Sequence, residues 1–283
     1  MRYTYYPGCT SETTAVEFGL SIEVVCEALD IELEELEDWN CCGASSAHSL
    51  DHELALALPG RNVALAQESG RDMIIPCPAC YQHCRDADLK MREDEAWRQK
   101  MERILDFHYE GDSRPRHFLE VLTNDLDEEA LKEKVVQPLE GLKVASYYGC
   151  VLVRPPELTG WDDPEHPTTM DRLVAAMGAE PIDWSYKVDC CGASMTLSRG
   201  DVVKVLSTKI VEGAIEAGAD CILSVCGMCQ INLDTRQAAS REVPILYLTE
   251  LMALALGLPG SNKWLSKHTT DPRPLLRERG FLE

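Results

Sequence analysis

The chain has 283 residues, of which 45% are hydrophobic, and this is enough for two domains that each bury a core. Its net charge of −21 argues against nucleic acid as a partner. No stretch approaches the roughly 18 uninterrupted apolar residues of a transmembrane helix, and the N-terminus lacks the pattern of a signal peptide. We therefore expect a soluble, cytoplasmic protein without a membrane span.

The acidic charge is distributed unevenly along the chain. Residues 1–140 carry 13 Lys and Arg against 30 Asp and Glu, whereas residues 141–283 carry 14 against 18. We interpret the excess as a solvated acidic exterior that favours solubility.

The predicted elements alternate between short apolar strands and amphipathic helices. In the first part of the chain they are a strand at 3–6, a helix at about 13–29, a strand at 31–36, a helix at about 52–69 interrupted near Pro59, and a strand at 72–75. The second part gives a strand at 143–148, helices at about 169–177 and 200–217, strands at 221–225 and 243–248, and a final helix from 249. This order predicts an α/β fold with small, mainly parallel sheets flanked by helices.

Two further segments have no strand pattern. Residues 93–140 are expected to form two or three charged helices that pad the first domain. The tail after Pro259 is expected to be loosely ordered, with a docking arm as the alternative.

A cysteine pattern that occurs twice in the same order indicates an internal duplication. The segment CCGAS occupies 41–45 and again 190–194. A lone cysteine precedes these segments, with 31 and 39 intervening residues respectively, and a Cys-x2-Cys follows each pair after 34 residues. We therefore predict two domains, 1–140 and 141–283, with the longer gap accommodated by a loop at 155–167.

The cysteines favour metal binding over disulfides. The chain has 13 cysteines and no export signal, and a reducing compartment keeps such thiols free. The lone cysteine and the Cys-x2-Cys of each copy follow strands, so they can converge at one edge of a parallel sheet. Zinc needs four ligands, and each copy offers five cysteines. An iron–sulfur cluster is therefore favoured, and zinc stays the alternative for a site.

The pattern C-x(31–39)-CC-G-x(33)-C-x2-C, present twice, resembles the B subunit of heterodisulfide reductase over nearly the whole chain. The segments YYPGCTSETTAVEFGLS and CPACYQHC look more like bacterial relatives than methanogen enzymes, and Val151 stands where the methanogen proteins typically have a histidine. The resemblance implies that each repeat, a CCG domain, binds one noncubane 4Fe-4S cluster through five cysteines. The implied ligands are Cys9, Cys41, Cys42, Cys77 and Cys80 for the first cluster, and Cys150, Cys190, Cys191, Cys226 and Cys229 for the second.

The resemblance also implies a function within a complex. The iron–sulfur C subunit and the flavin-containing A subunit of such a complex would exchange electrons with this chain. Cleaving a disulfide takes two electrons, whereas a cluster changes its state by one. We hypothesise that a small-molecule or protein-borne disulfide is cleaved or formed between two clusters. The alternative is an electron-relay subunit of a related complex, linked to sulfur-carrier oxidation or to fumarate and quinone, without a small disulfide substrate.

Several residues near the motifs are candidates for supporting roles. Gly43 and Gly192 are expected to adopt a turn conformation closed to other residues. Ser45 and Ser194 are candidates for hydrogen bonds to cluster sulfurs or for helix caps. His48 is a weak candidate for a catalytic proton donor, although an exposed or packed histidine is the simpler explanation.

The remaining cysteines, arginines and tyrosines have simpler interpretations. Cys84 follows Cys80 by one helical turn and is a candidate extra ligand, whereas Cys26 and Cys221 are expected in the core. Two arginines could recognise an acidic group on a substrate or simply lie on the surface: Arg154 and Arg199. Four tyrosines are expected to pack beside the lone cysteines and shield the clusters from water: Tyr5, Tyr6, Tyr147 and Tyr148.

Overall fold

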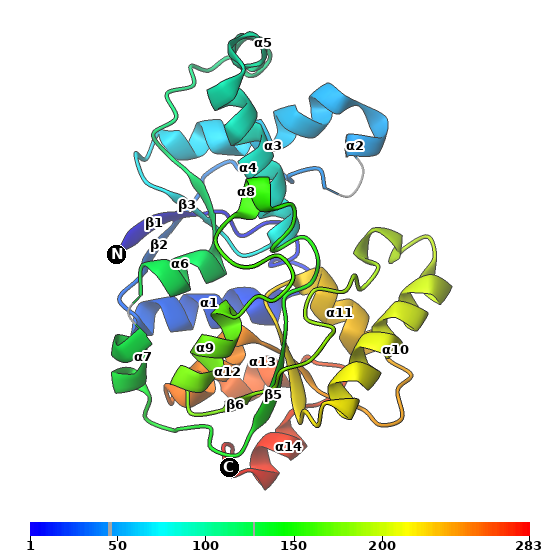
Figure 1. The fold of residues 1–283 in the computed structure, drawn as a ribbon. Coiled ribbons are helices and arrows are strands. Elements are labelled where there is room, and N and C mark those ends of the chain that lie inside the picture. The colour runs from blue at the N-terminus through cyan, green and yellow to red at the C-terminus, as the bar shows by residue number, and fades with distance from the viewer. Residues whose placement is uncertain (45–46, 127) are drawn as a thin grey trace.

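The computed structural model describes residues 1–44, 47–126 and 128–283, and its two sheets repeat one topology (Figure 1). The first sheet contains β1 (Arg2–Tyr5), β2 (Glu32–Glu35), β3 (Met73–Ile75) and β4 (Pro115–His117). The second contains β5 (Lys143–Tyr147), β6 (Glu180–Pro181), β7 (Cys221–Ser224) and β8 (Ile245–Tyr247). The strand orders are β2-β1-β3-β4 and β6-β5-β7-β8, and all pairs are parallel. The predicted α/β class is confirmed, with the duplication visible in the topology.

The helices of the first half (residues 1–140) cover its sheet and reach toward the second. They are α1 (Val16–Ala28), α2 (Ala47–Leu50), α3 (His52–Gln67), α4 (Pro78–Glu93), α5 (Glu95–Leu105), α6 (Phe118–Asn124) and α7 (Glu128–Lys134). The predicted interruption near Pro59 is wrong, because α3 is one helix with Pro59 in its interior. The two or three helices predicted at 93–140 are present as α5, α6 and α7, but the segment also contains the strand β4, which was not predicted. Pairing with β3, in the register Met73↔Pro115, makes this short segment a strand.

The second half (residues 141–283) has the corresponding helices and some additions. They are α8 (Pro156–Thr159), α9 (Thr169–Ala176), the 3-10 helix η1 (Ala193–Met195), α10 (Gly200–Glu216), α11 (Gly227–Arg236), α12 (Leu248–Ala255), α13 (Ser261–Leu265) and α14 (Arg273–Glu278). In the part of the chain that the structure describes, no helix has the length and apolar character needed to cross a bilayer.

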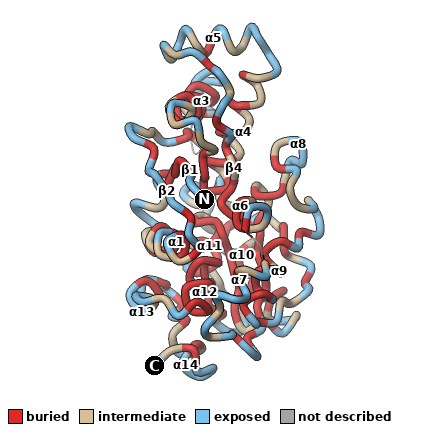
Figure 2. Tube along the Cα trace, turned by 90° about the vertical axis from the view of Figure 1, so that its left-hand side faces the viewer, coloured by how far each residue is buried: buried red, intermediate tan, exposed pale blue. Residues whose placement is uncertain are grey.

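The two halves pack through equivalent surfaces. Helix α1 packs against α12, and α9 packs against α6. Helices α1 and α9 each follow the first strand of their sheet, and α12 and α6 each follow the last strand. Each contact thus joins equivalent elements of the two halves, as an approximate two-fold axis requires. Phe18 stacks on Tyr247 with ring centroids 4.3 Å apart, and the buried hydroxyls of Ser21 and Thr249 are 2.6 Å apart. One hydrophobic core therefore includes residues of both halves, while the outlying helix α5 has one buried residue, Met101 (Figure 2).

The C-terminal tail is packed, so the expectation of a loosely ordered end is wrong. Trp264, Leu265 and Leu276 are buried in the shared core. His268 Nε2 lies 2.8 Å from Glu250 Oε1, and both side chains are fully buried. These anchors are single residues without a periodic pattern, and for this reason no helical signal was recognised there in the sequence.

We predict that His268→Ala lowers the free energy of unfolding by about 2–4 kcal/mol, because Glu250 is then buried without its charged partner. Chemical denaturation would measure the change. Lys263→Ala, an exposed substitution on α13, serves as the control and should stay within about 0.5 kcal/mol of the unmodified chain. Equal stability of the two variants would show that His268 does not anchor the tail.

Candidate functional site

In the first half, five cysteines converge beyond the carboxyl ends of the strands. Cys9 follows β1, Cys41 and Cys42 follow β2, and Cys77 and Cys80 lie at the junction of β3 and α4. In the sheet, β2 lies on one side of β1 and β3 lies on the other side. The loops after these strands therefore meet at the point where the strand order reverses, which is the usual place for a ligand in such sheets. The Sγ atoms of Cys42 and Cys80 are 3.0 Å apart, and thiol hydrogen bonds join Cys9 to Cys41 and Cys77 to Cys80. We call these five residues the first cysteine set.

The second half repeats the arrangement. The Sγ atoms of Cys191 and Cys229 are 3.6 Å apart, and a thiol hydrogen bond joins Cys150 to Cys190. At the start of α11 the Cys229 N–H donates to Cys226 Sγ at 3.4 Å. These residues form the second cysteine set. The structure thus brings together the five cysteines that the sequence predicted for each site.

Each set has a buried side and an open side. The second cysteine of the adjacent pair and both residues of the Cys-x2-Cys are buried in each half, with at most 8% of their surface exposed. In contrast, Cys9, Cys41 and Cys190 are exposed and Cys150 is partly exposed. A molecule that approaches either set from solvent would therefore first meet the lone cysteine and the first cysteine of the pair.

Buried tyrosines hold the loops that carry the adjacent cysteines. The Tyr6 hydroxyl donates to the Asn40 carbonyl at 2.9 Å, directly before Cys41, and the Tyr147 hydroxyl donates to the Asp189 carbonyl at 2.6 Å, directly before Cys190. Burial and the nearby cysteine sulfurs raise the pKa of both tyrosines, so the hydroxyls keep their protons for these bonds. The shielding role predicted for tyrosines therefore fits this pair.

In the first half, α3 supports the same loop. Asn62 is fully buried, and its side-chain amide accepts from the Asn40 N–H at 2.9 Å and donates to the Asn40 carbonyl at 2.7 Å. The position of Cys41 is therefore fixed from two sides.

Two glycines allow the backbone to approach the sulfurs. Gly8 and Gly149 precede the lone cysteines and have φ angles of +72° and +69°. A Cβ at these positions would lie 3.4 Å from Cys80 Sγ and 3.1 Å from Cys229 Sγ. A side chain there would thus be both strained and in tight contact with a proposed ligand. Gly43 and Gly192 have φ angles of +76° and +83°, which confirms the turn conformation expected of them.

The thiols of each set share protons. Hydrogen bonds from Cys41 and then Cys80 lower the pKa of Cys42 to about 3, and a hydrogen bond from Cys150 lowers the pKa of Cys190 to about 6. The pKa of Cys80 is raised, first by its hydrogen bond to Cys42 and also by burial. Thiolate charge therefore gathers in each set and favours a bound cation that accepts soft sulfur ligands.

The donor sets fit an iron–sulfur group better than a lone ion. Each set consists of thiols alone, with five sulfurs available. Among the described residues, no three or more His, Cys, Asp or Glu side chains surround a point as they would around one metal ion. The number of sulfurs carries the comparison, since four thiols fill a zinc site, whereas a cluster spreads its ligands over several iron atoms.

Two polar residues beside the sulfurs were not singled out from the sequence. Asn232 is fully buried, and its Nδ2 donates to Cys191 Sγ at 3.6 Å. His83 lies close enough to Cys42 to help lower the pKa of that thiol. Both residues lie three positions after the last cysteine of a Cys-x2-Cys, so they share its face of the helix. This repeated position was a usable signal in CPACYQHC and CGMCQINL.

Several predicted supporting residues have other surroundings. Ser45 and the His48 side chain lie outside the described residues, and Ser194 is exposed. Cys84 is fully buried, and within the described part of the chain its sulfur makes no hydrogen bond to the set. Its role as a ligand stays a prediction.

The other candidates belong to the core or the surface. Cys26 and Cys221 are buried, with 1% and 0% of their surface exposed. Tyr5 and Tyr148 lie in the core on the opposite face of their sheets from the cysteines. Two arginines make ion pairs with carboxylates near them in the sequence: Arg154 with Glu165, and Arg199 with Asp201.

Each Cys-x2-Cys helix contacts a loop of the other half. On α4, the Tyr81 hydroxyl donates to the Leu158 carbonyl at 3.3 Å and Gln82 Nε2 donates to the Arg154 carbonyl at 2.7 Å. The loop predicted at 155–167 thus lies against the first half. At the start of α11, a Cβ on Gly227 would lie 3.0 Å from the Ala15 Cβ, in the segment after Cys9. The segment after each lone cysteine therefore adjoins the helix that begins at the other half's Cys-x2-Cys.

Comparison with known proteins agrees with this duplicated site. Residues 3–85 and 144–234 each match the CCG cysteine-rich domain. The 8-methylmenaquinol:fumarate reductase membrane anchor subunit of Wolinella succinogenes is 32% identical over 97% of this chain and 99% of its own length. The B subunit of a ferredoxin/F420H2-dependent CoB-CoM heterodisulfide reductase of Methanosarcina acetivorans is 31% identical over 90% of this chain and 89% of its own. A protein of Archaeoglobus profundus described as like the heterodisulfide reductase B subunit is 30% identical over 91% of both chains.

A solved structure shares the fold. A hypothetical protein from Helicobacter pylori superimposes with a TM-score of 0.73 at 11% identity, over 95% of this chain. The present chain spans about half (52%) of that protein. With both repeats matched and relatives similar over nearly their full length, the chain belongs to the two-repeat CCG family that includes the B subunit of heterodisulfide reductase.

Proposed function

We propose that this chain is the iron–sulfur B subunit of a heterodisulfide reductase-like complex, with one noncubane 4Fe-4S cluster held by each cysteine set. The observation that carries the proposal is the matched pair of all-thiol sets, each with a buried side of three cysteines and an open side of two. The first set would provide Cys9, Cys41, Cys42, Cys77 and Cys80, and the second Cys150, Cys190, Cys191, Cys226 and Cys229.

The substrate in this proposal is a disulfide that binds against the open sides of the sets. A bound cluster supplies or accepts one electron at a time. Cleavage of the disulfide consumes two electrons and two protons and releases two thiols, and the reverse reaction forms the disulfide. The contribution of the chain is to hold two one-electron sites in one rigid core. Tyr6 and Tyr147 hold the cysteine-bearing loops and, being fully buried, keep water from the inner sulfurs.

Partner proteins would exchange the electrons. Relatives of this chain are subunits of heterodisulfide reductase complexes. We propose an iron–sulfur C subunit and a flavin-containing A subunit as partners, in the cytoplasmic location expected from the sequence.

The second candidate function is electron relay without a disulfide substrate. It is favoured by the similarity, over nearly the full length of both chains, to the anchor protein of a fumarate reductase that uses 8-methylmenaquinol. In that case the two cysteine sets would pass electrons between a quinol and a flavoprotein.

The role of the second set is tested by Cys191→Ser. We predict loss of the electron paramagnetic resonance signal of the second cluster and a decrease of at least about 100-fold in disulfide turnover, because a ligand and its buried contact with Cys229 are lost. Cys221→Ser is the matched control, since Cys221 is equally buried but lies in β7 outside the set. An unchanged signal and unchanged turnover in Cys191→Ser would refute the assignment.

The two candidate functions predict different partners and reactions. We expect anaerobic affinity purification of the full chain to recover a flavoprotein and a ferredoxin-like protein, and the assembly to reduce a disulfide. Recovery of a fumarate-reducing flavoprotein, with quinol-dependent turnover and no disulfide reduction, would instead support the relay function.

A further inference from the structure

An acidic edge runs along the first half, from α1 through β2 to the loop before Cys41. We define it as residues 23–38, which include eight Asp and Glu and no Lys or Arg. The corresponding segment before the second adjacent pair, residues 172–187, contains two Asp and Glu and two Lys and Arg. The strand and the loop are therefore present in both halves, whereas the excess of negative charge is present only in the first.

The acidic edge includes the outermost strand of the first sheet. β2 is the outermost strand, and within the described chain no strand pairs with its other side. Its residues Glu32, Glu34 and Glu35 are exposed, as is Glu37 in the loop that follows. An outer strand presents unpaired backbone N–H and C=O groups that another chain can contact.

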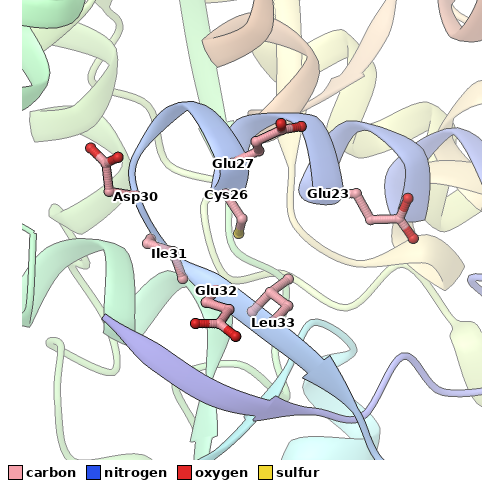
Figure 3. Close-up of a pocket in the computed structure, with 7 residues that line it drawn as sticks. All are labelled: Glu23, Cys26, Glu27, Asp30, Ile31, Glu32 and Leu33. Atoms are coloured by element: carbon pink, nitrogen blue, oxygen red, sulfur yellow. The ribbon is translucent and has the colours of Figure 1, made fainter.

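Hollows follow the same edge. One, of about 480 Å³, lies between α1 and β2, with the carboxylates of Glu23, Glu27, Asp30 and Glu32 around it and Cys26 pointing from α1 toward β2 (Figure 3). Two more, of about 350 Å³ and 500 Å³, lie along residues 34–39, and the larger of them also borders α3 and Arg71. Hollows therefore flank the outer strand and the loop that follows it.

Part of the negative charge is not neutralised by the chain itself. Arg2 pairs with Glu32 and Glu34, and Lys134 pairs with Asp30. Four carboxylates of the edge make no ion pair with any described residue: Glu23, Glu27, Glu35 and Glu37. This excess is available to a cationic surface, and it steers association over distances of about 10 Å.

Two aromatic residues connect the edge to the first cysteine set. Trp39 lines the 350 Å³ hollow, and its ring lies edge-on to Tyr6 with centroids 5.5 Å apart. Tyr6 lies beside the sulfurs of the set, including those of Cys42 and Cys80. A partner seated at the end of the edge would thus be separated from the first set by one aromatic pair.

We propose that the acidic edge docks a basic surface of the electron-carrying protein that serves the first cysteine set. This inference rests on the proposed function, since it assigns the place at which the electrons arrive. In each encounter the partner loses one electron and the first site gains one, and no bond is formed or broken. Charge complementarity of this kind mainly raises the association rate and weakens as salt is added.

The test uses the cluster-loaded full chain with cytochrome c as the probe, because that protein is a basic one-electron carrier. The variant Glu35→Lys/Glu37→Lys reverses two exposed charges on the edge. The matched control Glu216→Lys/Glu278→Lys makes the same change in net charge on exposed residues at the ends of α10 and α14. Binding at low and high salt gives the Kd, and hydrogen–deuterium exchange of the unmodified chain maps the contact.

We expect the edge variant to raise the low-salt Kd about tenfold and the control to raise it less than about threefold, with the difference lost at high salt. Cytochrome c should protect the backbone of residues 32–39 from hydrogen–deuterium exchange. Equal weakening of binding by both variants, or protection outside the acidic edge, would overturn the proposal.

Iron and acid-labile sulfide are measured in the unmodified chain and in each variant. Absence of both from the unmodified chain would contradict the proposed function, whereas normal content with unselective binding would contradict the docking surface alone.

Discussion

The reciprocal packing of the two halves is the constraint on which the site depends. A single parallel sheet of this topology can gather the cysteines of one set, because its loops meet beyond one end of its strands. The packing of α1 against α12 and α13, and of α9 against α6 and α7, joins two such sheets in one body. The stacked rings of Phe18 and Tyr247 and the hydroxyl pair of Ser21 and Thr249 lie at the centre of that contact.

The same packing connects the sites at closer range. Gln82 follows Cys80 by two residues and hydrogen bonds to the loop after Cys150, and Gly227 follows Cys226 directly and packs against the segment after Cys9. Each lone-cysteine loop is therefore in direct contact with the Cys-x2-Cys helix of the other half. The two cysteine sets are thus parts of one packed body and not of two independent domains.

The duplicated halves are alike at the sulfurs and differ around them. Tyr6 and Tyr147 make the same hydrogen bond, and Gly8 and Gly149 make the same close approach. The polar residue beside the inner sulfur is a histidine in one half and an asparagine in the other, and the acidic edge exists only in the first. Such differences would give two otherwise matched sites different reduction potentials and different access to partners.

The sequence predicted the duplication, the fold class and the grouping of the cysteines, because each depends on local patterns or on the geometry of parallel strands. It did not predict β4 or β6, since segments as short as Pro115–His117 and Glu180–Pro181 become strands only through pairing with a neighbour. The packed tail was missed for a related reason: His268 and Trp264 are single anchors whose partners are distant in sequence. Long-range contacts of this kind leave no periodic signal.

We propose that the chain holds two iron–sulfur clusters, one in each cysteine set. Quantitative analysis of iron, zinc and acid-labile sulfide in the anaerobically purified full chain tests this proposal. We expect about eight iron atoms and about eight sulfides per chain, with little zinc, as two four-iron clusters require. One or two zinc ions per chain and no labile sulfide would contradict it.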